Sequence, residues 1–310
     1  MHASHHHRGG SRPVTIENTN TPGSTSGWAA LPWSRLDGPV GLELAGIDVR
    51  QLAPEIIHAA IAEAQLLVFR DQRLDPLALT EFAARLGTPE QYPYANPLHD
   101  APYVVPIIKE PEDRANFGGD WHTDTSYLEQ PPAFTLLLAV ETPPTGGDTL
   151  FADMYGAYAA LSPRLQEWLD TLAARNVSGM VHDSGGAHAA VAGAIRGNRA
   201  AKAAEAVHPV VRVHPVTGRP ALYLSRIHSE HFIGLTREES VPLIDYLQNF
   251  AVRPERCSRL RWAPGTLAIW DNRCLQHYPL NDYHGHRREM HRIILAGERP
   301  RGLFEAPRDA

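Results

Sequence analysis

The chain has little cysteine, no long apolar run and no excess of positive charge. Cys257 and Cys274 are its only cysteines in 310 residues, which is too few for a disulfide framework. An apolar run of about 18 residues, as a transmembrane helix needs, does not occur, and the N-terminus lacks the order of a signal peptide. The net charge of −6 argues against nucleic acid or an anionic membrane as a partner. We therefore expect a soluble, cytoplasmic protein, and the sequence is compatible with a homo-oligomer.

Composition divides the chain into a tail and a globular part. Residues 1–30 are rich in Ser, Thr, Gly, Pro and Asn and poor in apolar residues, which predicts a disordered N-terminal extension. Residues 31–310 are long enough to form a single domain around one large core. Within them, 178–204 is rich in Gly and Ala without a clear period, and we expect a mobile lid there. No internal repeat is present.

Hydrophobic periodicity predicts short helices at the start and many short strands after them. Helices are expected over 53–64, from the cap Asp75 to Leu86, and over 153–161, 163–173 and 236–250. Compact or alternating apolar runs bounded by turn residues predict strands over 66–69, 133–140, 149–152, 207–213, 221–224, 259–262, 266–270 and 290–295. This pattern favours an α+β fold with a double-stranded β-helix (jelly-roll) core and flanking helices.

The most informative motif is a His-X-Asp pair with a second histidine far downstream. If His122 and Asp124 belong to one strand, their side chains lie on the same face, because side chains alternate with period two. His277 would then supply a second imidazole. Two nitrogens and one carboxylate on one side of a metal form the facial triad of non-heme Fe(II) oxygenases. The sequence therefore predicts His122, Asp124 and His277 as metal ligands and catalytic residues.

Two arginines follow at a spacing that suits an anion beside the metal. Arg288 and Arg292 share one face of an expected strand, whereas Arg287 does not. A guanidinium can bind a carboxylate through two parallel hydrogen bonds. An α-keto acid that chelates iron leaves its far carboxylate free, and we expect Arg288 to bind it, with Thr149 adding a hydroxyl donor.

Four segments together resemble the taurine dioxygenase (TauD/TfdA) family of Fe(II)/2-oxoglutarate-dependent dioxygenases. They are WHTD, PPTGGDTLFADM, HPVTGRPALYL and WDNRCLQHYPLNDYHGHRREMHR, and the resemblance runs from about Val40 to Pro300. It implies a jelly-roll core, the cofactor Fe(II), the co-substrates 2-oxoglutarate and O2, and hydroxylation with release of succinate and CO2.

The resemblance also implies roles for single residues. His122, Asp124 and His277 match the iron ligands, while Thr149 and Arg288 match the residues that hold 2-oxoglutarate. Arg292 matches the arginine that grips the sulfonate in taurine dioxygenase, although in other members the arginine at this point serves 2-oxoglutarate.

The expected substrate pocket differs from that of the taurine enzyme. Tyr92 and Gly118 stand where taurine dioxygenase has polar groups for its amine, and the segment before Trp121 is similar to the phenoxypropionate dioxygenases. We expect Tyr92 and Gly118 to give a roomier pocket, and His182 and His228 to contact substrate. The predicted substrate is a small organic anion: a sulfonate, an aryloxyalkanoate or an amino-acid-like carboxylate.

Three alternatives remain open at this point. The hydroxylated product could be a stable alcohol, or it could collapse with cleavage of a C–S or C–O bond. The same triad could hold Zn²⁺ in a hydrolase, although the arginines and Thr149 would then lack a purpose. A jelly-roll protein could also bind an anion without turnover. Oxygen-dependent consumption of 2-oxoglutarate separates the oxygenase from the other two.

Overall fold

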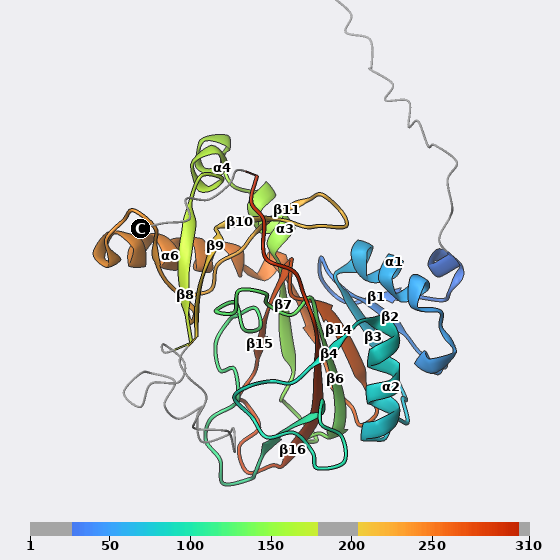
Figure 1. Cartoon of the computed structure of the whole chain (residues 1–310). Helices are drawn as coiled ribbons and strands as arrows, with labels where there is room; N and C mark the ends of the chain where they lie inside the picture. Colours follow the sequence, from blue (N-terminus) through green and yellow to red (C-terminus); the bar gives the residue numbers. More distant parts are fainter. Residues whose placement is uncertain (1–26, 179–203, 304–310) are drawn as a thin grey trace, which may run out of the picture.

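The computed structural model describes residues 27–178 and 204–303 (Figure 1). The expected lid therefore lies almost wholly outside the described residues, as does His182. Most of the expected N-terminal extension does too, but residues 27–30 form a 3-10 helix whose Trp28 packs against the core. The expected extension is thus too long at its C-terminal end.

Five α-helices and sixteen strands make up the described part. The helices are α1 (Pro54–Ala64), α2 (Pro76–Leu86), α3 (Met154–Ala159), α4 (Pro163–Leu169) and α6 (Arg237–Ala251). Further 3-10 helices span Val49–Gln51 and Pro254–Arg256. The strands are β1 (Ser34–Arg35), β2 (Leu42–Leu44), β3 (Leu66–Phe69), β4 (Pro89–Glu90), β5 (Val105–Lys109), β6 (Phe134–Glu141), β7 (Thr149–Asp153), β8 (Ala173–Val177), β9 (Glu205–Pro209), β10 (Val211–Val213), β11 (Pro220–Leu222), β12 (Ser229–Phe232), β13 (Cys257–Leu260), β14 (Leu267–Asp271), β15 (Leu275–Pro279) and β16 (Arg288–Leu295).

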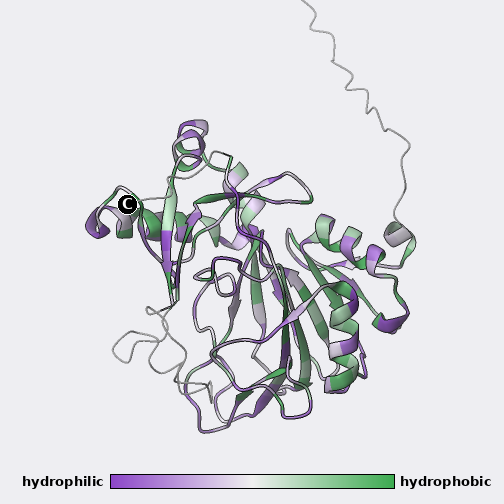
Figure 2. Cartoon of the chain, viewed as in Figure 1, coloured by the Kyte–Doolittle hydropathy of each residue, from purple (hydrophilic) through white to green (hydrophobic). Residues whose placement is uncertain are grey.

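Two sheets form the jelly-roll core. The larger has the order β1-β2-β3-β14-β6-β16-β4, with β5 also paired to β16, and the smaller has the order β13-β7-β15. The apolar side chains of one buried cluster come from strands of both sheets, among them Val68, Leu137, Phe151 and Met290. Figure 2 colours the strands of the larger sheet mainly as hydrophobic. The expected sandwich of short strands is confirmed.

Helices α1 and α2 cover the outer face of the larger sheet (Figure 1). Ile57 and Ile61 of α1 and Leu79 and Phe82 of α2 are buried against it, at helical spacing. Both helices carry proline at their first position, where no backbone donor is needed. Asp75 caps α2 by accepting a hydrogen bond from the amide of Ala78 at 2.8 Å, as its sequence predicts.

The remaining helices and short strands pack around a separate apolar cluster beside the sandwich. Here one expectation is wrong: the helix predicted over 163–173 ends at Leu169. Ala173 already begins β8, which pairs with β9 on one side and β12 on the other. Both edges of β8 thus have hydrogen-bond partners for their backbone N–H and C=O groups. This long-range pairing overrides the local preference for helix. Among the described helices, none has the length and apolarity needed to cross a bilayer.

Candidate metal and anion site

The candidate site lies inside the jelly roll, where β15 meets the segment before β6. His122 forms a single β-bridge with His277, with backbone N–O distances of 3.1 and 2.8 Å. Asp124 is not in a strand: it lies in a turn whose next residue, Thr125, has φ +45°. The expected single strand carrying both ligands is therefore wrong. A tight turn, rather than strand alternation, brings the carboxylate beside the imidazoles.

The three predicted ligands do converge. Donor atoms of His122, Asp124 and His277 all lie within 4.8 Å of one another. Oδ1 of Asp124 is 3.8 Å from Nε2 of His122 and 4.0 Å from Nε2 of His277. All three side chains are buried. Two nitrogens and one oxygen thus face one point, as the facial triad requires.

Hydrogen bonds orient two of the ligands. Nδ1 of His122 donates to the carbonyl oxygen of Asp120 at 2.7 Å, which leaves the Nε2 lone pair directed at Asp124. The Thr135 hydroxyl donates to Oδ2 of Asp124 at 2.6 Å and accepts from the Asn272 side-chain amide at 2.9 Å. Oδ1 is then the carboxylate oxygen that faces the two imidazoles. These contacts fit a metal ion.

The protonation states suit metal binding as well. Burial lowers the pKa of His122, and it lowers the pKa of His277 well below the usual histidine range, so both imidazoles are neutral. Burial raises the pKa of Asp124, but the positive charge of the Arg292 guanidinium is the largest opposing influence, and the net pKa is lowered. Neutral imidazoles and an ionised carboxylate are the forms that coordinate a metal.

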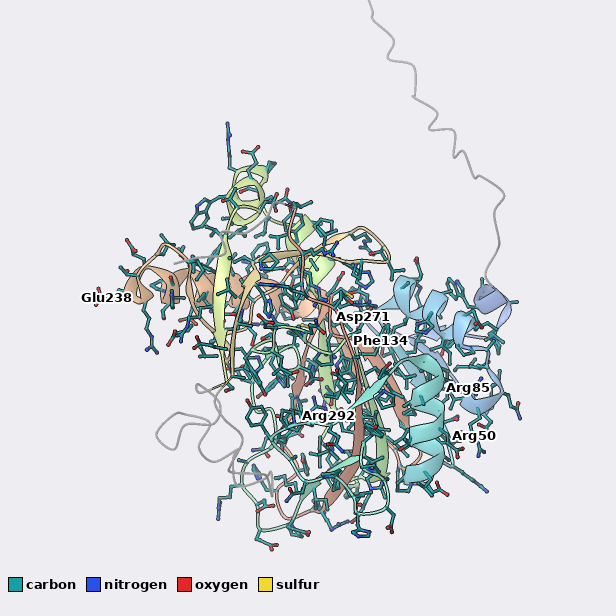
Figure 3. All side chains as sticks on the ribbon, in the orientation of Figure 1. Arg50, Arg85, Phe134, Glu238, Asp271 and Arg292 are labelled. Carbon is teal, nitrogen blue, oxygen red and sulfur yellow. The ribbon has the colours of Figure 1, made fainter. Side chains whose placement is uncertain are left out.

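A pocket that opens to solvent adjoins the triad. Arg288 and Arg292 both face it from β16, and Thr149 faces it from β7, as predicted. Figure 3 shows Arg292 within the body of the molecule, whereas Arg50 and Arg85 lie at its outer edge. The other lining residues are mainly apolar: Ile107, Phe117, Leu137, Trp270 and Pro279.

The two arginines differ in whether a carboxylate of the protein pairs with them. Nη2 of Arg292 lies 2.9 Å from Oδ1 of Asp124, and its guanidinium faces the ring of Tyr92. Arg288 is buried, yet its Nε and Nη2 have no hydrogen-bond partner among the described residues. A buried guanidinium with unused donors is costly unless an anion binds it. The unused donors of Arg288 therefore suit an anionic ligand, and Thr149 lines the same cavity.

Three residues expected at the substrate pocket are not among those that line this cavity. Tyr92 packs against Arg292 and Phe117. Gly118 lies against His122: a Cβ there would be 2.6 Å from Cε1 of the imidazole. His228 bonds through Nδ1 to the Ser126 hydroxyl at 2.9 Å, and its ring packs edge-on against His122. These residues position the triad and the arginine in this structure.

Several site residues were not found from the sequence. Ile107 and Phe117 line the cavity but occur in segments without a motif, and Pro279 lies within the segment that begins at Trp270 but was not singled out. Trp270 is buried and also lines the cavity, with its ring 4.8 Å from that of His277. Thr135 offered a signal, because it is the only polar residue in the run 133–140.

A second group of metal-binding residue types, His214, Asp271 and Cys274, is structural. Nδ1 of His214 accepts from the amides of Val216 and Thr217, so Nε2 carries the proton and donates to Asp271 at 3.0 Å. Arg273 pairs with the same carboxylate at 2.7 Å. No lone pair of His214 is left for a metal.

The jelly roll, the triad and the buried arginine define a non-heme iron dioxygenase that uses 2-oxoglutarate, and comparison with known proteins agrees. The model of the "Taurine catabolism dioxygenase TauD, TfdA family" matches residues 34–294, and the chain belongs to this family. It is accordingly an oxidoreductase that depends on Fe(II), 2-oxoglutarate and O2.

Named relatives cover most of the chain. An alpha-ketoglutarate-dependent sulfate ester dioxygenase of Pseudomonas putida is 34% identical over 283 residues, which cover 86% of this chain and 89% of the relative. An alkylsulfatase of Acinetobacter baylyi is 32% identical over 277 residues, 86% of each chain. The crystal structure of a taurine dioxygenase from Burkholderia xenovorans superposes with a TM-score of 0.72 at 29% identity, covering 87% of this chain and 92% of that one.

Proposed function

We propose that this dioxygenase hydroxylates a small organic sulfate ester or sulfonate at the carbon bonded to the sulfate oxygen or to sulfur. In this proposal His122, Asp124 and His277 bind the metal, Arg288 and Thr149 bind 2-oxoglutarate, and Arg292 binds the anionic group of the substrate. The observation that carries the proposal is the pair of buried arginines on one face of β16, both directed into the cavity that contains the triad. One cavity with two guanidinium groups suits two different anions.

The cavity wall supports an alkyl or aryl chain on that anion. Phe117, Leu137 and Trp270 line the same pocket as Arg292 and are apolar or aromatic. A chain that is buried there gains from the hydrophobic effect, whereas the ammonium group of taurine would find no dedicated acceptor among the described lining residues. The names of the relatives, a sulfate ester dioxygenase and an alkylsulfatase, also favour this class.

When bound, Fe(II) with 2-oxoglutarate and O2 supplies the oxidant; one oxygen atom enters succinate and the other enters the substrate C–H bond. Arg292 holds the sulfate group so that the adjacent carbon faces the triad, and the buried walls exclude water. The new hydroxyl then loses its proton as its carbon–oxygen double bond forms. The bond from carbon to the sulfate oxygen breaks with its electron pair on sulfate, and an aldehyde and inorganic sulfate are released.

The roles of the two arginines can be separated by kinetics. Arg288→Gln should raise the KM for 2-oxoglutarate about tenfold or more, because a charge-assisted bidentate contact is lost. Arg292→Gln should instead raise the KM for an alkyl sulfate, with the enzyme saturated in metal and 2-oxoglutarate. Arg287→Gln is the matched control, since Arg287 pairs with Glu289 at 2.8 Å on the surface. An Arg292 variant that affects only 2-oxoglutarate would overturn our division of roles.

The substrate class is tested by a panel of alkyl sulfates, alkyl sulfonates, aryloxyalkanoates and amino acids. Succinate release that depends on an alkyl sulfate or sulfonate, with matching sulfate or sulfite, supports the proposal. Coupling to an aryloxyalkanoate or an amino acid alone would contradict it.

We also propose a cytoplasmic location. Cys257 and Cys274 are both free thiols in the structure, as is usual in a reducing compartment. Fractionation of cells that produce the protein tests this: recovery with periplasmic or secreted proteins would contradict it.

A further inference from the structure

Lysine is almost absent from this protein. The sequence has only two, Lys109 and Lys202, among 29 basic Lys and Arg residues, and Lys202 lies outside the described part. Lys109 ends β5 and is only 4% exposed. An ammonium group is strongly hydrated, so lysine is rarely buried without a partner. A single buried lysine in a chain that otherwise uses arginine requires a physical explanation.

Lys109 lies directly opposite Arg288. The antiparallel register of β5 and β16 pairs these two residues, and directly opposite residues project to the same face. Like charges in such a pair destabilise a sheet. Both side chains are buried, and among the residues placed in the structure neither Nζ of Lys109 nor Nε and Nη2 of Arg288 has a hydrogen-bond partner. The pair therefore presents two cations and at least three unused donor atoms.

The surrounding charges do not neutralise the pair. Within the described ranges, neither residue has a carboxylate at ion-pair distance; Asp113 and Asp148 act on them only through longer-range attraction. Asp148 is engaged by Arg259 at 2.6 Å, and Asp113 accepts from the backbone amide of Glu110 at 2.9 Å. The described residues therefore do not supply the counter-charge that the pair lacks.

A second pocket is lined by both Arg288 and Lys109. It shares Ile107, Phe117, Pro279 and Arg288 with the cavity of the triad, so Arg288 stands where the two spaces meet. The Lys109 ammonium lies 4.0 Å from the centre of the Tyr283 ring, and the Tyr283 hydroxyl donates to Oδ1 of Asn116 at 2.9 Å. The ring steadies the cation but gives its N–H groups no acceptor.

We propose that Lys109 is a second cationic residue for the far carboxylate of 2-oxoglutarate, acting together with Arg288. This inference rests on the proposed role of Arg288. Two cations around one carboxylate explain why both can be buried, because the ligand supplies the charge that each lacks. They also let the site distinguish a keto diacid from a keto monoacid of the same length, since loss of that carboxylate would leave two cations unpaired.

The test measures binding without turnover. The Mn(II)-loaded protein is titrated under anoxic conditions with 2-oxoglutarate and with 2-oxopentanoate, which lacks the far carboxylate. Lys109→Met should weaken 2-oxoglutarate binding about tenfold to a hundredfold, as expected for a lost hydrogen bond to a charged group, and leave 2-oxopentanoate binding unchanged. Lys109→Arg should recover most of the affinity, and Lys202→Met, which changes the only other lysine, should match the wild type.

The outcomes separate this inference from the proposed function. If Lys109→Met binds both ligands as the wild type does, or weakens both equally, Lys109 does not contact the far carboxylate and the inference is wrong. If only its response to added inorganic anions changes, the pocket binds a separate anion and the inference is again wrong. Arg288→Gln gives the independent reading: if it retains full 2-oxoglutarate affinity, the proposed role of Arg288 itself fails.

Discussion

Oδ1 of Asp124 lies near three nitrogens from three residues. The imidazoles of His122 and His277 approach it at 3.8 and 4.0 Å, and Nη2 of Arg292 at 2.9 Å. The same oxygen is thus a metal ligand in our proposal and the partner of a buried guanidinium. Asp124 consequently has a structural role that the two histidines lack, because without it Arg292 is a buried cation with no counter-charge.

This difference predicts unequal effects on stability. Asp124→Ala should lower the free energy of unfolding of the metal-free protein by about 3–5 kcal/mol, the usual cost of breaking a buried ion pair. His277→Gln, which removes no charge, should cost about 1 kcal/mol. Both should abolish succinate release. Urea unfolding measures the difference, and Asp124→Ala/Arg292→Met should regain most of the lost stability. Equal destabilisation by the two single changes would count against a structural role for Asp124.

Thr135 gives a second prediction at this scale. Thr135→Val keeps the volume but removes the hydroxyl that donates to Oδ2 of Asp124. Loss of such a supporting contact typically reduces metal affinity about tenfold to a hundredfold. Competition for Mn(II) or Co(II) with a chelator measures the change. Thr80→Val on α2, whose hydroxyl bonds only to the Pro76 carbonyl, is the control. Wild-type affinity in the Thr135 variant would show that this hydroxyl does not orient the ligand.

At the scale of elements, the segment between β5 and β6 decides the site. Gly118 has φ +71° and approaches the His122 ring so closely that no side chain fits. Gly118→Ala should therefore displace the imidazole and weaken metal binding. Gly234→Ala is a matched control: its φ is +84°, but a Cβ there meets open space, so backbone strain is the same without the contact. Equal metal affinity in the two variants would rule out the steric role of Gly118.

The sequence predicted elements best where local chemistry determines them. The residues that cap and bury α1 and α2 lie within those helices or next to them, so their limits follow from Asp75 and the apolar spacing. The end of α4 and the start of β8 depend on pairing with β9 and β12, which no local pattern of 163–173 records. The turn at Asp124 was missed for a similar reason, because Thr135 of β6 bonds to Asp124 and His228 bonds to Ser126 in the same turn.

At the scale of the whole molecule, buried histidines couple stability to pH. Burial lowers the pKa of His208 from its ordinary value of 6.5 to about 4, and its Nε2 bonds to the Leu128 carbonyl at 2.8 Å. The folded state thus holds this imidazole neutral. The contribution of the neutral His208 to the free energy of unfolding is fully present above pH 6.5, and it is lost as the pH falls from 6.5 toward 4.

Between pH 7.5 and pH 5, the His208 imidazole should lower the free energy of unfolding by about 2 kcal/mol. Urea unfolding at both pH values measures the change. In His208→Gln, whose new side chain does not titrate, the fall in the free energy of unfolding should be smaller than in the wild type by that amount. A pH dependence identical in the variant and the wild type would contradict the assignment.

The sequence predicted which residues belong to the site better than it predicted how they are arranged. His122, Asp124, His277 and Arg288 were predicted from their residue types and their order in the chain, because few other residues can bind a metal or a carboxylate as they do. Lys109 and Phe117 were not found, since their importance arises only from the β5–β16 register and the packing of a loop. Residues whose role depends on their chemistry can be predicted from the sequence, whereas residues whose role depends on their position can be found only from the fold.

The central claim is that substrate oxidation here is coupled to 2-oxoglutarate at the His122–Asp124–His277 triad. The most direct test is incubation with ¹⁸O2, Fe(II), 2-oxoglutarate and an alkyl sulfate, followed by mass spectrometry of the products. The account predicts one ¹⁸O atom in each succinate, one succinate for each sulfate released, and no product from His277→Gln. Sulfate released without oxygen or succinate, as a hydrolase would release it, would contradict the account.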